Sequence, residues 1–210
     1  MTPATPATPV TPVQTPRRLQ ILDTAAELFA ARGFHGVSVG DIGAAVGISG
    51  PALYKHFAGK QDILGACLLH ASEQLLEGAR ELTAGAAGRS GSNDPDDTGK
   101  GSGDTALTRL IAFHTDFALT QPALIVVQER EWGALGEAAR AAVRERQLAY
   151  IEVWTRALAP HRPDLAPPEA RAAVQAAFGL LNSTPHSARI SRTTMRDLLI
   201  GMAESALTPT

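Results

Sequence analysis

The sequence contains a single cysteine, Cys67, among its 210 residues. One thiol cannot form a disulfide within the chain, and low cysteine usage is typical of a reducing compartment, so we expect a cytoplasmic protein. There is also no run of about 18 uncharged apolar residues that would predict a membrane-spanning helix. Residues 1–16 have neither the early basic charge nor the apolar core of a secretory signal. We therefore expect no membrane partner.

A strong charge of either sign is also missing. The 19 basic residues nearly balance the 21 acidic ones, and the net charge is −2 at pH 7. Overall charge thus gives no reason to expect nucleic-acid binding, which would have to depend on a local patch. Residues 17–62 carry five basic and four acidic side chains, so they are only slightly more basic than the rest of the chain.

Catalytic patterns are absent from residues 104–207, which show no phosphate-binding glycine loop, no metal-spaced Cys and His set and no nucleophile–base pair. His114, His161 and His186 are far apart in sequence, and a lone histidine usually has a structural role. We therefore expect no enzymatic activity, no cofactor and no metal site. An all-α enzyme stays open as an alternative, and so does a metal sensor that uses these histidines.

The apolar residues recur at three- and four-residue steps, and sustained alternation is not seen, so the chain is predicted to be all-α. Proline and glycine separate the segments. The predicted helices cover residues 17–32, 39–46, 51–57, 60–83, 104–120, 122–133, 136–159, 167–183 and 191–207. Residues 1–16, which repeat Thr-Pro, are predicted to be a disordered tail, and the Gly/Ser/Asp-rich residues 85–104 a flexible loop.

Residues 38–57 have the layout of a helix-turn-helix, in which the second helix enters the DNA major groove. Ser38 and Asp41 are suited to the start of the first helix, Gly47 to the sharp turn, and Ser49 to a cap of the second helix. The apolar residues expected to hold the two helices together are Ile42, Val46, Ile48, Leu53 and Phe57. The residues then left to face outward are Gly50, Pro51, Ala52, Tyr54, Lys55 and His56.

The stretch "RRLQILDTAAELFAARGFHGVSVGDIGAAVGISGPALYKHFAGKQDIL" (17–64) resembles the DNA-binding domain of the TetR/AcrR family of transcriptional repressors. The resemblance rests on Gly33-Phe34 after the first helix, on "DIGAAVGIS", on "LYKHF", and on Lys60 followed by Ile63-Leu64. It implies a helix-turn-helix domain at 17–62 and a helical ligand-binding and dimerisation domain at 63–210. It also implies a homodimer that binds a palindromic double-stranded DNA operator and releases it when a small molecule binds. An activator or a metal-sensing regulator with the same DNA-binding domain stays open as an alternative.

By the same resemblance, Tyr54, His56 and Lys60 match positions that contact operator phosphates, and Ser38 lies where a helix N-terminus can meet another phosphate. Base reading would fall to Gly50, Pro51, Ala52 and Lys55, beside Ser49. Few of these side chains can bond to a base, so we expect Lys55, methyl contacts and DNA shape to decide the sequence choice. Arg17 and Arg18 can reach a phosphate or serve only as exposed charges.

The C-terminal region offers bulky and polar side chains for an apolar effector, although aromatic residues at helical spacing are more often core than pocket. The candidate ligand residues are Phe113, Phe117, Arg130, Trp132, Tyr150, Phe178, Asn182 and His186. The stretches "QEREWGAL" and "GLLNSTPHS" resemble a subgroup of such regulators associated with fatty-acid or acyl-CoA metabolism, so an acyl-CoA-like effector is expected.

The last two predicted helices are expected to pair with their symmetry mates in a four-helix dimer interface. The alternative is that they pack only within the chain. The residues assigned to the interface are Ala173, Val174, Ala177, Leu181, Met195, Leu198, Leu199 and Met202.

Overall fold

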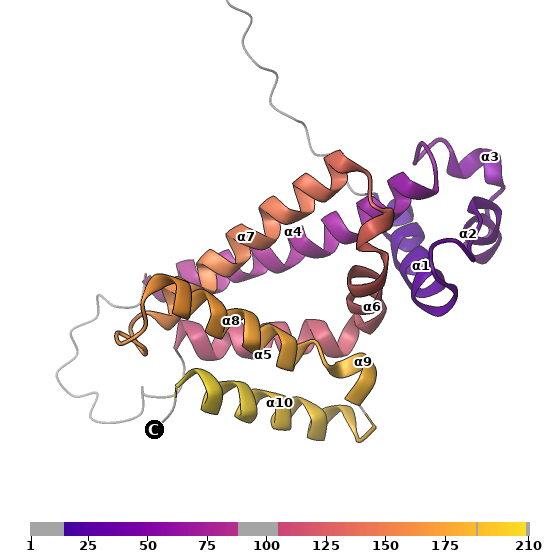
Figure 1. Cartoon of the computed structure of the whole chain (residues 1–210). Coiled ribbons are helices and arrows are strands. Elements are labelled where there is room, and N and C mark those ends of the chain that lie inside the picture. Colours follow the sequence, from indigo (N-terminus) through magenta and orange to yellow (C-terminus); the bar gives the residue numbers. More distant parts are fainter. Residues whose placement is uncertain (1–14, 88–104, 188, 209–210) are drawn as a thin grey trace, which may run out of the picture.

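The computed structural model describes residues 15–87, 105–187 and 189–208, which contain helices and no strand. Most of the predicted tail and residues 88–104 of the predicted loop lie outside these ranges, whereas residues 85–87 form the end of a helix. The elements are α1 Pro16–Arg32, α2 Val39–Ala45, α3 Gly50–Leu53, α4 Lys60–Ala87, α5 Ala106–Thr120, α6 Pro122–Glu131, the 3₁₀ helix η1 Trp132–Ala134, α7 Glu137–Leu158, α8 Pro167–Leu181, α9 Thr184–Ser187 and α10 Arg192–Leu207 (Figure 1). The all-α prediction is confirmed.

Local sequence explains the first two helices. Thr15 caps α1 with its side chain, Pro16 occupies the first turn, where its missing N–H costs nothing, and Gly33 ends the helix at φ 73°. Ser38 and Asp41 form a capping box at the start of α2, because each side chain accepts a hydrogen bond from the other residue's backbone N–H.

The predicted third helix is shorter than expected. Regular α-helix covers only Gly50–Leu53, and residues 54–56 form turns. The N–H groups of Lys55 and His56 donate to carbonyls three residues back, at 3.2 and 2.9 Å, so the last part of the segment tightens. The helical path still ends near Phe57, whose ring is buried.

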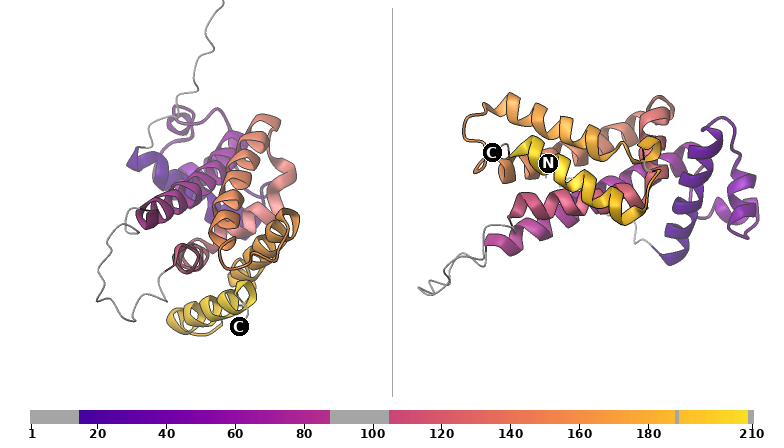
Figure 2. Two further views of the ribbon diagram at one scale, coloured as in Figure 1. Left: turned by 90° about the vertical axis from the view of Figure 1, so that its left-hand side faces the viewer. Right: turned by 90° about the horizontal axis from the view of Figure 1, so that it is seen from below.

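The C-terminal helices form a layered bundle beside the first three helices. The long helices α4 and α7 lie side by side, α5 and α8 pack beneath them, and α10 covers α5 and α8 on the far side (Figures 1 and 2). Helix α6 crosses between α1 and the bundle (Figure 1). Among the described helices, none alone is long and apolar enough to cross a membrane; α5 and α6 pass that test only as a pair, across a bend of 83°.

Two clusters of buried apolar side chains hold the fold together. The first contains Phe29, Ile42, Leu53 and Phe57 from the N-terminal helices and continues into α4, α6 and α7. The second surrounds Trp154 and joins α4, α5, α7, α8 and α10. The predicted boundary at residues 62 and 63 falls inside α4, a continuous helix that contributes to both clusters.

Candidate functional site

The helix-turn-helix is built as the sequence predicts. Ile42, Val46, Leu53 and Phe57 are buried between α2 and α3, and Ile48 packs against them while partly exposed. Gly47 has φ 70°, a left-handed conformation that costs other residues about 1–2 kcal/mol. The turn therefore sets the angle between the two helices, and the apolar contacts fix it.

Two arginines at the start of α1 hold the ends of these helices. Arg17 donates through Nη2 to the carbonyl of Val46 at 2.8 Å, where α2 ends. Arg18 donates through Nη1 to the carbonyl of His56 at 2.8 Å, and its guanidinium lies 4.0 Å from the centroid of the Phe57 ring. Positive charge at a helix C-terminus is stabilising. Both arginines therefore stabilise the C-terminal ends of α2 and of the segment that begins with α3, a role that the sequence did not predict.

The predicted DNA-contacting residues lie around the exposed end of this unit. Tyr54 is 57% exposed, and Ser38, Pro51, Lys55 and His56 are exposed as well. Gly50 and Ala52 are partly exposed.

Ser49 occupies the N-cap position of α3, but its side chain makes no capping bond, so the predicted capping role is wrong. Its exposed hydroxyl is left for an outside partner.

Lys60 has a structural role that the sequence did not predict. Its Nζ donates to the carbonyls of Phe34 and Val37 at 2.7 and 2.8 Å and lies 4.3 Å from the centroid of the Phe34 ring. The ammonium thus fixes the loop that leads into α2. An ammonium has three donors, so one N–H is left for the predicted phosphate contact, which stays a prediction.

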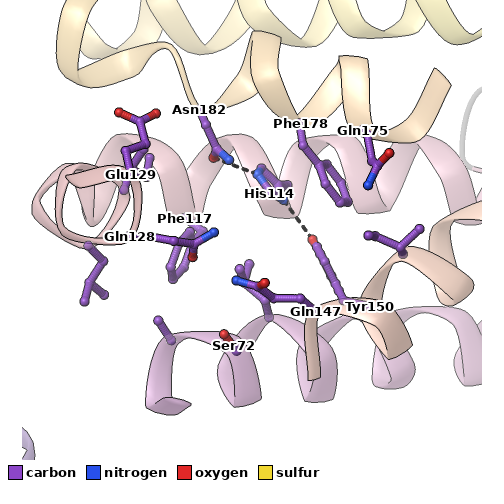
Figure 3. Close-up of a pocket in the computed structure, with 15 residues that line it drawn as sticks. Ser72, His114, Phe117, Gln128, Glu129, Gln147, Tyr150, Gln175, Phe178 and Asn182 are labelled. Carbon is purple, nitrogen blue, oxygen red and sulfur yellow. Dashed lines mark hydrogen bonds between the residues drawn. The ribbon is translucent and has the colours of Figure 1, made fainter. Parts of the chain in front are cut away.

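The C-terminal bundle contains an open cavity of about 270 Å³ between α4, α5, α6, α7 and α8. Both apolar and polar side chains line it (Figure 3). The lining residues are Ala71, Ser72, Leu75, His114, Phe117, Leu124, Ile125, Gln128, Glu129, Gln147, Tyr150, Ile151, Gln175, Phe178 and Asn182.

A buried chain of hydrogen bonds forms one wall of this cavity. His114 Nδ1 lies 2.9 Å from the Tyr150 hydroxyl, and His114 Nε2 lies 3.0 Å from Asn182 Oδ1 (Figure 3). The His114 ring stacks on Phe178 at 4.8 Å between centroids, with an interplanar angle of 7°. Burial lowers the pKa of His114 to about 4, because the charged imidazolium loses its hydration there.

Four of the eight predicted ligand residues line the cavity: Phe117, Tyr150, Phe178 and Asn182. The other four do not. The Phe113 ring lies against Gly78 of α4, and Trp132 packs on the first apolar cluster. Arg130 points to the N-terminal helices, while the exposed His186 is 3.4 Å from Glu129 Oε2.

His114 and the glutamines of the lining were missed. Glutamines carry no positional signal, but His114 did: it falls on the buried stripe of α5 with Leu107, Leu110, Ile111 and Ala118. An ionisable residue on a core-facing stripe indicates a polar partner inside the fold. No group of three or more His, Cys, Asp or Glu residues that could hold a metal occurs in the part of the chain that the structure describes.

The predicted dimer interface needs a correction. Five of its residues are buried within the second apolar cluster of the chain itself, where a partner subunit cannot reach them: Val174, Ala177, Leu181, Met195 and Leu199. Leu198 and Met202 are 49% and 46% exposed, and Ala173 is partly exposed. The prediction assigned side chains of the core-facing side to the partner.

Helix α6 connects the cavity with the N-terminal helices. Leu124, Ile125 and Gln128 line the cavity. One turn later, Arg130 Nη1 donates to the carbonyl of Ala30 at 3.1 Å, and Glu131 Oε1 accepts the N–H of Phe34 at 3.1 Å. A displacement of α6 would therefore move the end of α1 and the loop before α2.

Residues 21–67 match the sequence model of the family described as "Bacterial regulatory proteins, tetR family". The transcriptional activator FasR of Mycolicibacterium smegmatis is 37% identical over 65 residues, 31% of this chain and 30% of FasR. The transcriptional repressor KstR2 of Rhodococcus jostii is 40% identical over 68 residues, 32% of this chain and 33% of KstR2. The alignments thus span about a third of the length of these curated relatives.

Solved structures extend the similarity to the whole fold. A TetR-family regulator from Bordetella parapertussis is 26% identical, with 89% of this chain and 93% of that chain covered at a TM-score of 0.69. The regulator FadR from Bacillus subtilis, solved with stearoyl-CoA, is 20% identical, with 90% and 98% covered at a TM-score of 0.62. The second likeness concerns the fold alone.

Proposed function

We propose that the chain, whose N-terminal sequence and fold resemble those of TetR-family transcriptional regulators, is a repressor that binds a palindromic operator as a homodimer and is released by a small molecule. The observation that carries this proposal is helix α6. Its side chains line the cavity, and the next turn bonds to the end of α1 and to the loop before α2.

Operator binding is supported by the exposed group at the end of the helix-turn-helix. A phenol at Tyr54, an imidazole at His56 and an ammonium at Lys55 can each bond to a phosphate or base oxygen. Arg18 bonds to the backbone carbonyl of His56 and Arg17 to that of Val46, so these bonds restrain the backbone beside the exposed side chains before DNA binds. Such preorganisation lowers the entropic cost of binding.

Release by a ligand is supported by the geometry of α6. A molecule that enters the cavity contacts Ile125 and Gln128, and any shift of α6 changes the bonds of Arg130 and Glu131. If the ligand binds better to a conformer with the wrong spacing of recognition helices, it shifts the population away from DNA. Operator binding and ligand binding then oppose each other by the same factor.

Dimerisation through α8 and α10 is supported by what these helices leave exposed. Leu198 and Met202 of α10 are large apolar side chains at the surface, one helical turn apart. The exposed face of α8 carries small residues, Ala172, Ala176 and Gly179. Small residues let a partner helix approach closely, so these faces suit a symmetric four-helix contact.

The curated relatives regulate in both directions, since FasR is named an activator and KstR2 a repressor. Release from the operator on ligand binding favours repression for this chain. The effector expected from the sequence was acyl-CoA-like, as in the FadR complex.

The test is fluorescence anisotropy with two labelled duplexes, one from the region upstream of the gene and one of scrambled sequence. We expect tight, salt-dependent binding to the upstream duplex and weak binding to the scrambled one. Tyr54→Phe should weaken both about two- to tenfold, because a phosphate bond of about 0.5–1.5 kcal/mol is lost without loss of sequence information. Equal affinity of the wild-type protein for both duplexes would refute the operator proposal.

A further inference from the structure

The cavity has an unusual balance of charge. Within the described residues, its lining includes one charged side chain, Glu129, and no lysine or arginine. Arg146, which precedes the lining residue Gln147, is paired with Glu145 at 2.9 Å and with Glu73 at 4.0 Å. An anion placed in this cavity would lose hydration without gaining a basic partner, and it would approach a carboxylate.

The buried polar wall also offers no positive charge. Asn182 Oδ1 accepts, so His114 Nε2 carries the hydrogen, and His114 Nδ1 accepts from the Tyr150 hydroxyl. Both ring nitrogens are therefore occupied by protein groups and the imidazole is neutral. The groups left for a ligand are the amide N–H groups of Asn182 and the lone pairs of the Tyr150 oxygen, supplemented by the carboxamides of Gln128, Gln147 and Gln175.

The apolar part of the lining indicates a second property of the ligand. Phe117, Leu124 and Ile125 line the cavity together with its polar groups. A ligand that has both apolar surface and hydrogen-bonding groups would therefore match the lining.

We propose that the cavity takes a partly apolar ligand of neutral or positive charge that carries hydrogen-bonding groups, and that Glu129 selects against anions such as fatty acids. This inference rests on the proposed ligand-responsive function and names the chemical class of the effector. Glu129 is half exposed and paired with His186 at 3.4 Å, so a cationic ligand would replace that exposed pair.

Three probes of nearly the same shape test the charge: benzamidine, benzamide and benzoate. Binding to the full chain is measured by calorimetry and by thermal shift. We expect benzamidine to bind at least about tenfold more tightly than benzoate, a difference of about 1.4 kcal/mol, with benzamide between them. Palmitoyl-CoA and palmitate serve as the acyl probes and should bind more weakly than benzamide.

Glu129→Gln should remove the preference for benzamidine over benzamide and leave benzamide affinity unchanged within about twofold. Glu152→Gln is the matched control. It also removes one carboxylate, but Glu152 lies on α7 and does not line this cavity. Tighter binding of benzoate or palmitoyl-CoA, or an unchanged preference in Glu129→Gln, would overturn the assignment and leave ligand-responsive regulation standing. Binding of no probe at all would also overturn it. The regulatory proposal itself fails only if small molecules extracted from the host cells never release the upstream duplex.

Discussion

Replacement of His114 by glutamine should make the protein more resistant to mild acid. In the folded chain, burial lowers the pKa of His114 to about 4, whereas an unfolded chain has an ordinary histidine pKa of about 6.5. As the pH falls below about 6.5, this histidine binds a proton in the unfolded state but stays neutral in the folded state. The equilibrium therefore moves toward unfolding. His114 therefore leaves the stability of the folded chain intact above pH 6.5, and this stability is lost progressively as the pH falls from 6.5 toward 4.

The magnitude follows from the two pKa values. Between pH 7 and pH 5, His114 alone should lower the unfolding free energy of the wild-type protein by about 2 kcal/mol. The loss begins near pH 6.5, where the unfolded chain starts to take up the proton, and each pH unit below that is worth about 1.4 kcal/mol. Glutamine can still bond to Tyr150 or Asn182 but does not titrate. The variant should therefore lose about 2 kcal/mol less than the wild type over the same interval, whatever its stability at pH 7.

Urea denaturation at pH 7 and pH 5, followed by circular dichroism at one protein concentration, measures this difference. His161→Gln is the control, because it removes an exposed histidine outside the cavity. Hydrogen bonds from Ser38 and Arg162 lower the pKa values of the Asp41 and Asp164 carboxyls. Protonation of these carboxyls therefore destabilises the folded chain mainly below about pH 5. Equal loss in wild type and His114→Gln would refute the assignment of a buried neutral imidazole.

Three further substitutions test other parts of the structure. Gly47→Ala should lower the free energy of unfolding by about 1–2 kcal/mol, and the Tm by several degrees, because φ 70° is strained for alanine. The added Cβ would meet no atom within 4 Å, so the loss reports the backbone strain alone. As the control, Gly40→Ala in α2 should leave Tm unchanged or slightly higher. Lys60→Met should lower Tm because two carbonyls lose a charged donor, and it should reduce the salt slope of DNA binding by about 0.9. An unchanged slope would remove Lys60 from the DNA contacts. Leu198→Asp should dissociate the dimer at micromolar concentration in sedimentation velocity, whereas the equally exposed Leu148→Asp on α7 should not; a dimer that survives Leu198→Asp would exclude this face as the interface.

The parts of the fold that local chemistry decides could be predicted from the sequence. Ser38, Asp41 and Gly47 act within a few residues of themselves, through a capping box and a left-handed turn, so the helix-turn-helix is readable one segment at a time. The resemblance to regulators of this family then followed from the order of these signals. The family's sequence model matches the same region, residues 21–67, and confirms the resemblance there.

Long-range contacts could not be predicted in this way. Arg18 and His56 are 38 residues apart in sequence, and Lys60 reaches Val37 across 23 residues, so nothing local indicates either bond. The same limit explains the dimer residues. The spacing of Val174, Ala177 and Leu181 identifies one face of α8, but only the position of α10 and α7 shows that this face belongs to the chain's own core.

The central claim is that the exposed end of the α2–α3 unit, presented twice by a symmetric dimer, recognises an operator. Hydroxyl-radical footprinting of the full chain on the upstream duplex tests it most directly. The account predicts two protected segments related by a twofold axis, with centres about 10–10.5 base pairs apart or a multiple of that distance, as successive major grooves on one face of the duplex require. A single protected segment, or uniform protection without sequence preference, would contradict it.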